Sequence, residues 1–483
     1  MNNNSQSVHL KKEILIRIVK AFFSDNFEGE TRLIPYDMRP KGSDVPYRCC
    51  IYKEREILRD RTIAGLGFSI ENDDERDLLS DYAKKALDRK EIEENPLTVL
   101  EAACKGCVPS RIYVTDLCQG CVARPCQSSC KFGAINFVNN KSVIDGEKCK
   151  NCKMCVNVCP YNAIVKLKVP CEDSCPVDAI AKNEHGLARI DFSKCISCGK
   201  CVSSCPFGAV HEKSQIIDIL KQIKAGKKVI AMVAPSIVGQ FPGNIYQLNT
   251  AMLKAGFSKV YEVAQGADIT TKNEAKDFKE RMEQGDAFMT TSCCAGYNEF
   301  IKKHLPEIKP FVSHTGTPLY YIAEIAKKEH PDSVTVFVSP CVAKRKEGMI
   351  NDNIDYILNF EELGALFIGR QIDVVECGET PFDVESSKQG RNFALSGGVA
   401  EAVKSATKNN EGICPFHING LTKDSIKQLK KFAKDGKCQE GNLVEVMCCE
   451  GGCIGGNATI NAIKKAAKVL KDFSELSKDI EAE

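Results

Sequence analysis

The sequence predicts a chain in three parts that ends in an α/β domain with largely parallel sheets. Residues 1–95 are charged and carry a mostly helical pattern, and residues 96–212 hold sixteen of the 27 cysteines. From residue 213 to 483, short β-rich runs alternate with amphipathic stretches, which is typical of strands joined by helices. At 483 residues the chain is long enough for two or three domains, each with its own core.

The first segment, residues 1–95, has turn signals around Pro40 and Pro46 but no motif that indicates a function. It opens MNNNSQSVHLKKEI, which lacks the apolar core of a secretion signal. We therefore expect a cytoplasmic protein with reduced cysteines. Cys49 and Cys50 are adjacent and poorly placed to bind one cluster, so we interpret them as buried structural thiols.

The middle segment repeats a cysteine spacing that binds iron–sulfur clusters. Two runs follow the C-x2-C-x2-C-x3-C-P pattern of bacterial ferredoxins, and a third run has a longer middle gap. The runs are Cys149, Cys152, Cys155 and Cys159; Cys195, Cys198, Cys201 and Cys205; and Cys118, Cys121, Cys126 and Cys130. Zinc sites more often use two separated pairs of ligands, so clusters are favoured. The segment is predicted to be a ferredoxin-like α+β domain that carries electrons in a low-oxygen setting.

Exchange of fourth ligands between neighbouring runs sorts all sixteen cysteines into four [4Fe–4S] sites. Two half-motifs, Cys104-x2-Cys107 and Cys171-x3-Cys175, complete the count. The predicted sets are Cys118, Cys121, Cys126 and Cys159; Cys149, Cys152, Cys155 and Cys130; Cys195, Cys198, Cys201 and Cys175; and Cys104, Cys107, Cys171 and Cys205. The last set joins the most distant segments.

Four predicted strands of the C-terminal part each end at a motif. Residues 228–233 lead into Ala234-Pro235-Ser236, 287–290 into Thr291-Ser292-Cys293-Cys294, 333–338 into Ser339-Pro340-Cys341, and 443–447 into Cys448-Cys449-Glu450-Gly451-Gly452-Cys453. Because ligands of open α/β sheets bind at the carboxyl ends of strands, we expect these loops to converge. Their thiols suffice for a further iron–sulfur cube, and Lys344 offers a cation to an anionic ligand.

The three cysteine motifs, in this order, resemble the signatures of the [FeFe]-hydrogenases. They are Thr-Ser-Cys-Cys at 291–294, Pro-Cys-x-Ala-Lys at 340–344 with Glu347, and Glu-x-Met-x-Cys-x-Gly-Gly-Cys-x-Gly-Gly at 445–456. The resemblance implies an H-cluster, in which one cysteine joins a [4Fe–4S] cube to a two-iron unit with CO, CN and a dithiolate amine. It also implies the reaction H2 ⇌ 2 H+ + 2 e−, with electrons passing through about four accessory clusters to or from a soluble ferredoxin. Maturation enzymes would install the two-iron unit.

The resemblance also implies roles for individual residues. The cube ligands would be Cys294, Cys341, Cys449 and Cys453, with Cys453 as the bridge to the two-iron unit. The surroundings of the cofactor would be Ala234, Pro235, Ser236, Ser339, Pro340, Lys344 and Met447, with Ser236 and Lys344 donating to the cyanides. The proton relay would be Cys293, Glu274, Asp277 and Ser313. Without the resemblance, Glu274 and Asp277 would be interpreted as a solvated helix face and Cys293 as a plain buried thiol.

Four residues depart from the best-known hydrogenase pattern: Ala295, Leu319, Ser339 and Cys448. They resemble the divergent monomeric branch called group B, which also has a Pro-Cys-x3-Cys-Pro element like the one at 170–176. We expect these changes to alter the potential of the catalytic iron, its oxygen response or its directional bias.

Other functions fit parts of the sequence. An H2-sensing relative should have an added signalling module, and none is evident in these residues. An iron–sulfur scaffold protein that lacks the two-iron unit would not need Cys293, Lys344, Glu274 and Asp277 together. If the chain were a ferredoxin joined to an unrelated domain, the presence of all three motifs would be a coincidence. The net charge of +2 and the lack of an apolar run of ~18 residues argue against nucleic-acid and membrane partners. The isolated residues Cys377, Cys414, Cys438, His304, His314 and His417 are interpreted as ordinary side chains of the fold.

Overall fold

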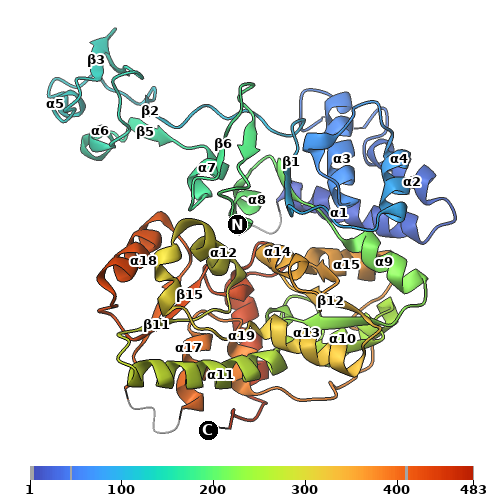
Figure 1. Cartoon of the computed structure of the whole chain (residues 1–483). Coiled ribbons are helices and arrows are strands. Elements are labelled where there is room, and N and C mark those ends of the chain that lie inside the picture. Colours follow the sequence, from blue (N-terminus) through green and yellow to red (C-terminus); the bar gives the residue numbers. More distant parts are fainter. Residues whose placement is uncertain (1–4, 44–45, 408–411, 482–483) are drawn as a thin grey trace.

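The N-terminal segment is a group of helices in the computed structural model, which describes residues 5–43, 46–407 and 412–481 (Figure 1). Its elements are α1 (Gln6–Phe22), α2 (Phe27–Met38), α3 (Ile51–Gly65), the 3-10 turn η1 (Ile70–Asn72) and α4 (Leu79–Asp88). In α1 the buried apolar residues Ile14, Leu15, Ile18, Val19 and Phe22 follow the three- and four-residue spacing of one helix face. This face packs inward, so the segment is an integral part of the fold.

The cysteine-rich segment consists of short antiparallel strand pairs and one-turn helices. Its elements are β1 (Leu97–Val99), β2 (Arg111–Val114), α5 (Pro125–Ser128), β3 (Ile135–Val138), β4 (Lys141–Ile144), α6 (Met154–Val158), β5 (Ile164–Leu167), α7 (Pro170–Ser174), β6 (Ile180–Lys182), β7 (Ala188–Ile190), α8 (Lys200–Ser204) and β8 (Val210–Glu212). The pairs are β1–β8, β2–β5, β3–β4 and β6–β7. In each four-cysteine run a residue with positive φ starts the short helix: Arg124 at 42°, Lys153 at 66° and Gly199 at 75°. These turns bend the chain sharply between the second and third cysteines. The unit formed by β2 to β5 projects away from the rest of the chain (Figure 1).

The C-terminal part alternates helices with parallel strands. Its elements are α9 (Ile216–Lys224), β9 (Val229–Val233), η2 (Pro235–Ile237), α10 (Ile245–Ala255), β10 (Lys259–Glu262), α11 (Val263–Glu283), β11 (Met289–Thr290), α12 (Ala295–His304), η3 (Pro306–Phe311), α13 (Pro318–Glu329), β12 (Val334–Val338), α14 (Ala343–Met349), β13 (Tyr356–Leu358), α15 (Phe360–Gly369), α16 (Lys388–Asn392), α17 (Gly398–Ala406), β14 (Pro415–Asn419), α18 (Lys423–Asp435), β15 (Leu443–Met447), η4 (Cys453–Gly455) and α19 (Ile463–Ser474). The strand orders are β10–β9–β12–β13 and β11–β15–β14, and every pairing in these two sheets is parallel. The predicted α/β fold with parallel sheets is confirmed, and the four motif-bearing strands are divided between the two sheets.

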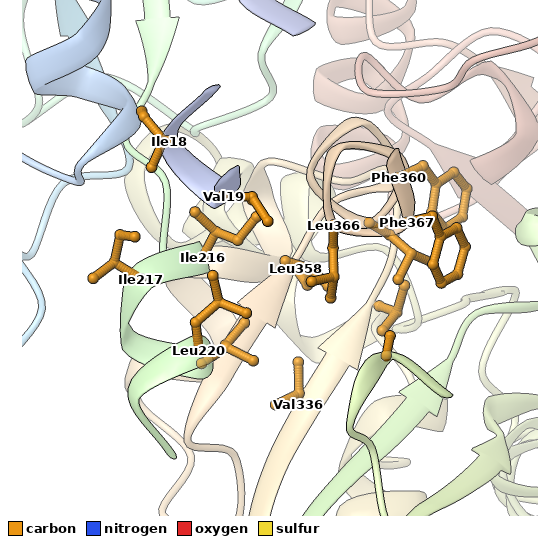
Figure 2. Packing of buried hydrophobic residues seen from close by; sticks show 14 of the residues in the cluster. Ile18, Val19, Ile216, Ile217, Leu220, Val336, Leu358, Phe360, Leu366 and Phe367 are labelled. Atoms are coloured by element: carbon orange, nitrogen blue, oxygen red, sulfur yellow. The ribbon is translucent and has the colours of Figure 1, made fainter. Parts of the chain in front are cut away.

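One hydrophobic core runs through both the N-terminal helices and the α/β domain. Figure 2 shows Ile18 and Val19 of α1 beside residues of α9, β12, β13 and α15. The labelled residues from these later elements are Ile216, Ile217, Leu220, Val336, Leu358, Phe360, Leu366 and Phe367. The first segment therefore buries its apolar face against the last one. No helix among the described residues is long and apolar enough to cross a membrane.

A buried network of charges joins all three segments. Lys11 of α1 lies 2.6 Å from Glu361 of α15 and 3.6 Å from Glu212 at the end of β8. Arg345 of α14 lies 2.7 Å from Glu362 and 3.7 Å from the same Glu212. The side chain of Arg345 is 1% exposed. Since buried charges are tolerated only when they are paired, this network holds the three segments in one relative position.

Candidate functional site

The four cysteines predicted to hold the catalytic cube come together at the ends of strands from both sheets. Cys341 follows β12, Cys294 follows β11, and Cys449 and Cys453 follow β15. Burial, followed by the nearby Cys341, Cys294 and Cys453, raises the pKa of the Cys449 thiol. Burial, followed by the charge of Cys294, raises the pKa of Cys341 to about 12, and burial, followed by Cys341 and Cys294, raises the pKa of Cys453 to about 12. Each thiol therefore lies within electrostatic reach of the others.

The four thiols match an iron–sulfur cube in the number and type of their ligands. In the side-chain arrangement of the described residues, no group of three or more His, Cys, Asp or Glu side chains could hold a metal ion. Cys453 is exposed, so its thiol is accessible to a ligand. Bound iron would stabilise the thiolate form of these cysteines.

Polar groups beside the cysteines are suited to an anionic ligand. The hydroxyl of Ser236 is fully buried and has no hydrogen-bond partner among the described residues. Lys344 Nζ donates to both carboxylate oxygens of Glu347, at 2.8 and 2.6 Å, and Thr317 Oγ1 donates to Glu347 at 2.6 Å. Burial opposes the charge on Lys344, but Glu347 holds its pKa above the ordinary value. Because buried polar groups are nearly always hydrogen-bonded, the unpartnered hydroxyl of Ser236 indicates that a ligand binds beside it.

The remaining residues predicted to surround the cofactor are mostly apolar and buried. Ala234 is 7% exposed, Met447 3% and Ser339 2%, and Pro340 is also buried, whereas Pro235 is partly exposed. Met447 packs in one cluster with Cys293. Ser339 Oγ accepts a hydrogen bond from the backbone N–H of Cys341 at 3.1 Å. These residues therefore exclude water from the thiols and orient the loop that carries Cys341.

Glu274, the first predicted relay carboxyl, is fully buried in the middle of α11. Its Oε1 accepts hydrogen bonds from Ser292, at 3.1 Å from the backbone N–H and 3.4 Å from the hydroxyl, while Oε2 has no partner among the described residues. Burial raises the pKa of Glu274 to about 7. Burial, followed by the charge of Glu274, raises the pKa of Cys293. Glu274 is thus close to Cys293 and is not part of a solvated helix face.

Asp277, one turn further along α11, lies toward solvent with 16% of its side chain exposed. Its two carboxylate oxygens accept hydrogen bonds from Arg281 Nε at 2.9 Å and from the backbone N–H of His314 at 2.8 Å. Despite its burial, the bonds from His314, Arg281 and Ser313 hold the pKa of Asp277 below its ordinary value. Ser313 is held near the cysteine loop because its N–H donates to Thr290 O at 2.8 Å. The four predicted relay residues therefore lie in one region.

Cys448 and Leu319, two of the residues that depart from the hydrogenase pattern, make specific contacts in the structure. The backbone N–H of Cys448 donates to Cys294 Sγ at 3.4 Å. A Cβ at position 296 would lie 3.0 Å from Cys448 Sγ, so the thiol requires Gly296 beneath it. Leu319 is 1% exposed and packs in one cluster with Ala234. Ala295 begins α12 and is buried.

The two outer sets of predicted cluster ligands each line one cavity. Cys118, Cys121, Cys126 and Cys159 line the first cavity, and Cys130, Cys149, Cys152 and Cys155 line the second. The fourth cysteine of each run thus lies with the other run, as the ferredoxin spacing predicts.

The two inner sets are brought together in the same way. Burial, followed by the charges of Cys198, Cys195 and Cys175, raises the pKa of Cys201. Burial, Cys205 and Cys107 raise the pKa of Cys171 to about 11. Cys104 and Cys205 pack against the same core cluster.

The inner set that contains Cys198 adjoins the catalytic loops. A hydrogen bond with the Cys448 thiol is the main cause that lowers the pKa of Cys198 to about 7. Asn457 Nδ2 donates to Cys198 O at 2.5 Å, and Asn457 Oδ1 accepts from Ser203 at 2.9 Å. A continuous path of close contacts therefore connects the cysteine-rich segment to the candidate catalytic thiols.

The interpretation of Cys49 and Cys50 as buried thiols is wrong. Cys49 is exposed and Cys50 is partly exposed, because they lie at the start of α3, where the chain enters the helix from the surface. Sequence reasoning also missed Ser292 and Arg281, which bind the two relay carboxyls. Arg281 lies four residues after Asp277 in one helix, a spacing that could have indicated the pair.

Family comparisons agree with this site. Residues 227–457 match the model described as iron only hydrogenase large subunit, C-terminal domain. Residues 142–165 match a 4Fe-4S binding domain, and residues 165–216 match the LdpA Fe-S cluster-binding domain. The C-terminal part is thus of the iron-only hydrogenase class, preceded by iron–sulfur binding segments.

Individual relatives are similar over part of the chain. Iron hydrogenase 1 of Clostridium pasteurianum is 28% identical over 381 residues, which cover 66% of this chain and 65% of that protein. The periplasmic [Fe] hydrogenase large subunit of Nitratidesulfovibrio vulgaris is 27% identical over 301 residues, covering 50% and 72%. A solved variant of [FeFe]-hydrogenase HydA1 from Chlamydomonas reinhardtii is 20% identical with a TM-score of 0.43, covering 53% and 88%. The match spans slightly under two thirds of the first relative's own length. Over part of its length the chain is divergently homologous to [FeFe]-hydrogenases, and the predicted resemblance is confirmed.

The raised pKa of Glu274 predicts a specific pH dependence of stability. The pKa is about 7 in the folded chain and 4.5 ordinarily, so the folded state holds this proton more tightly than the unfolded state. The carboxyl therefore costs stability progressively as pH rises from about 4.5 to about 7. Glu274→Gln removes this penalty, so its free energy of unfolding relative to wild type should increase by about 1 kcal/mol between about pH 6 and pH 8. Urea unfolding at both pH values measures the difference, and parallel pH profiles would contradict the assignment.

Proposed function

We propose that the chain catalyses the reversible reaction H2 ⇌ 2 H+ + 2 e− at an H-cluster. The observation that carries this proposal is the convergence of Cys294, Cys341, Cys449 and Cys453 beside the unpartnered hydroxyl of Ser236. An electron-transfer protein has no need for a fifth cysteine set in a closed α/β domain with a buried carboxyl next to it. The homology to iron-only hydrogenases supports the same reaction.

The residues around the four cysteines bind the cofactor and exclude water. When bound, the H-cluster supplies the redox-active iron and a basic amine. Ser236 and Lys344 would donate hydrogen bonds to its anionic ligands, and such hydrogen bonds are stronger where water is excluded. Met447 and Leu319 keep that pocket apolar. This arrangement would favour binding of the two-iron unit, which protein ligands by themselves would bind only weakly.

Protons leave through the relay side chains. The Cys293 thiol holds a proton next to the reacting centre and passes it to Glu274, whose pKa of about 7 suits exchange near neutral pH. Ser313 and Asp277 then carry the proton toward the partly exposed end of the relay. Each H2 oxidised releases two protons by this route and two electrons through the accessory clusters.

Electrons pass between the catalytic loops and a soluble ferredoxin through the cysteine-rich segment. Cys198 lies against Cys448 at the inner end of this path. At the outer end, residues 111–168 contain nine lysines and arginines against three acidic residues, and Cys152 is exposed between the exposed Lys150 and Lys153. A projecting basic unit with an exposed cluster ligand suits the docking of an acidic electron carrier.

Infrared absorption tests the proposed cofactor. The anaerobically matured protein should show CO and CN stretching bands that shift when H2 is added. Cys449→Ser should lose these bands, whereas Cys438→Ser, which changes a thiol that is not one of the predicted ligands, should keep them. Absence of bands in protein that has passed through the maturation enzymes would contradict the proposal.

Substitution of the relay residues should separate turnover from cofactor binding. Cys293→Ala and Glu274→Gln should each lower H2 turnover by about 10²-fold or more, because a positioned proton carrier contributes that much. Their infrared bands should remain. The matched control is Glu280→Gln, which makes the same change on α11 at an exposed side chain and should leave turnover unchanged. Near-normal turnover in either relay variant would refute the path.

Charge reversal on the projecting unit should slow electron exchange with ferredoxin. The double variant Lys150→Glu/Lys153→Glu should lower the ferredoxin-dependent rate by about tenfold at low salt, with a smaller difference at high salt because ions screen the attraction. Turnover with a small dye should stay the same. Lys427→Glu on α18 is the control for a change of charge at an exposed site. An equal loss of the ferredoxin-dependent rate in the double variant and in the Lys427→Glu control would contradict docking at this unit.

A further inference from the structure

A second cavity, of about 550 Å³, lies outside the hydrogenase site between the N-terminal helices and the end of the cysteine-rich segment. Helix α1 contributes Leu10, helix α3 contributes Ile57 and Arg61, and Phe207 lies two residues after Cys205. A cavity of this size accommodates a small organic molecule. None of the three matching family models covers the helices that form it.

The walls of the cavity carry an excess of positive charge. Arg39, Arg48, Arg61 and Lys105 line it, and Glu54 is the only acidic residue among its described lining residues. Both oxygens of Glu54 are engaged, by Arg39 Nε at 2.5 Å and by the backbone N–H of Arg48 at 3.0 Å. The side chains of Arg48, Arg61 and Lys105 therefore remain available to an anion.

Arg61 is buried with an unused donor. Its side chain is 3% exposed, Nη2 donates to Phe207 O at 3.1 Å, and Nε has no partner among the described residues. Gly208, at φ +57°, allows this approach, because a Cβ there would lie 2.7 Å from the guanidinium. Burial lowers the pKa of Arg61 to about 10, and the group stays charged near neutral pH. A buried positive charge that is incompletely paired is costly, and an anion bound in the adjoining cavity would offset part of that cost.

Much of the rest of the wall is apolar or aromatic. Leu10, Ile57, Tyr47 and Phe207 face the cavity. The Arg48 guanidinium lies 5.3 Å from the Phe207 ring centre, which places a cation and an aromatic surface side by side. Such a wall suits a ligand with an organic body as well as a charged group.

We propose that this cavity binds a small organic phosphate of about mononucleotide size. The phosphate would contact Arg48, Arg61 and Lys105, and the organic body would pack against Tyr47 and Phe207. A phosphate monoester carries a charge of about −1.5 to −2, which matches three cations better than a single carboxylate does. Arginine forks also bind phosphate through paired hydrogen bonds.

The cavity lies close in the chain to a predicted cluster ligand. Arg61 donates to Phe207 O, two residues after Cys205. A ligand bound there would lie beside a predicted cluster ligand, and this placement rests on the proposed function.

Calorimetric titration of the full-length, anaerobically purified protein tests the site at constant ionic strength. Three probes are compared. AMP carries both the phosphate and the organic body, inorganic phosphate carries only the phosphate, and adenosine carries only the organic body. AMP should bind most tightly and adenosine least. Arg48→Ala and Lys105→Ala should each weaken AMP binding by about tenfold, whereas Arg76→Ala, an exposed arginine of the same segment, should not change it.

Several results would overturn the proposal. They are no saturable AMP binding at millimolar concentration, equal affinity for adenosine and AMP, equal affinity for phosphate and AMP, or unchanged binding in both Arg48→Ala and Lys105→Ala. The titration does not depend on hydrogen chemistry. H2 turnover measured on the same preparation without AMP therefore distinguishes failure of this site from failure of the proposed function.

Discussion

The buried pairing of Arg345 with Glu362 and Glu212 is the interaction on which the rest of the arrangement depends. Arg345 directly follows Lys344, and its Nη1 also donates to Ile357 O at 2.9 Å. These buried contacts of Arg345 fix the position of α14. Glu212 is shared with Lys11 of the N-terminal helices. Loss of one partner from a buried ion pair costs about 3–5 kcal/mol, because the other charge stays buried and unpaired. The loop that presents Cys341 and Lys344 is thus held by contacts from all three segments.

The residues proposed to carry electrons and those proposed to carry protons lie in different parts of the structure. Accessory cysteine sets approach the catalytic thiols from the cysteine-rich segment, whereas Glu274 and Asp277 lie on α11, on the opposite side of the α/β domain (Figure 1). The thiols themselves are poorly ionised, since burial and their mutual proximity raise the pKa values of Cys341 and Cys453 to about 12. A bound cationic cluster would stabilise these thiols as thiolates, so the proposed cofactor would also stabilise the loops that carry them.

Features with a local cause could be predicted from the sequence. The spacing of the cysteine runs requires tight turns, and Lys153 and Gly199 supply them with positive φ. The apolar runs before Ser339 and Cys448 are strands, because each stretch is short and buried on both faces. The order of the motifs was enough to recognise the hydrogenase homology. The exposure of Cys49 was predicted wrongly, because burial depends on what packs against a residue and not on its type alone.

The sequence by itself determined the ligand types, their spacing and the parallel α/β character, since each depends on residues close together in the chain. Only the tertiary structure decided that the motif strands lie in two sheets and that α1 shares its core with α15. It also decided the burial of Glu274 and the cavity around Arg61. The physical reason is that burial and electrostatic pairing depend on distances between residues far apart in sequence. Arg61 and Phe207, for example, carry no sequence pattern that links them, yet they form a hydrogen bond in the folded chain.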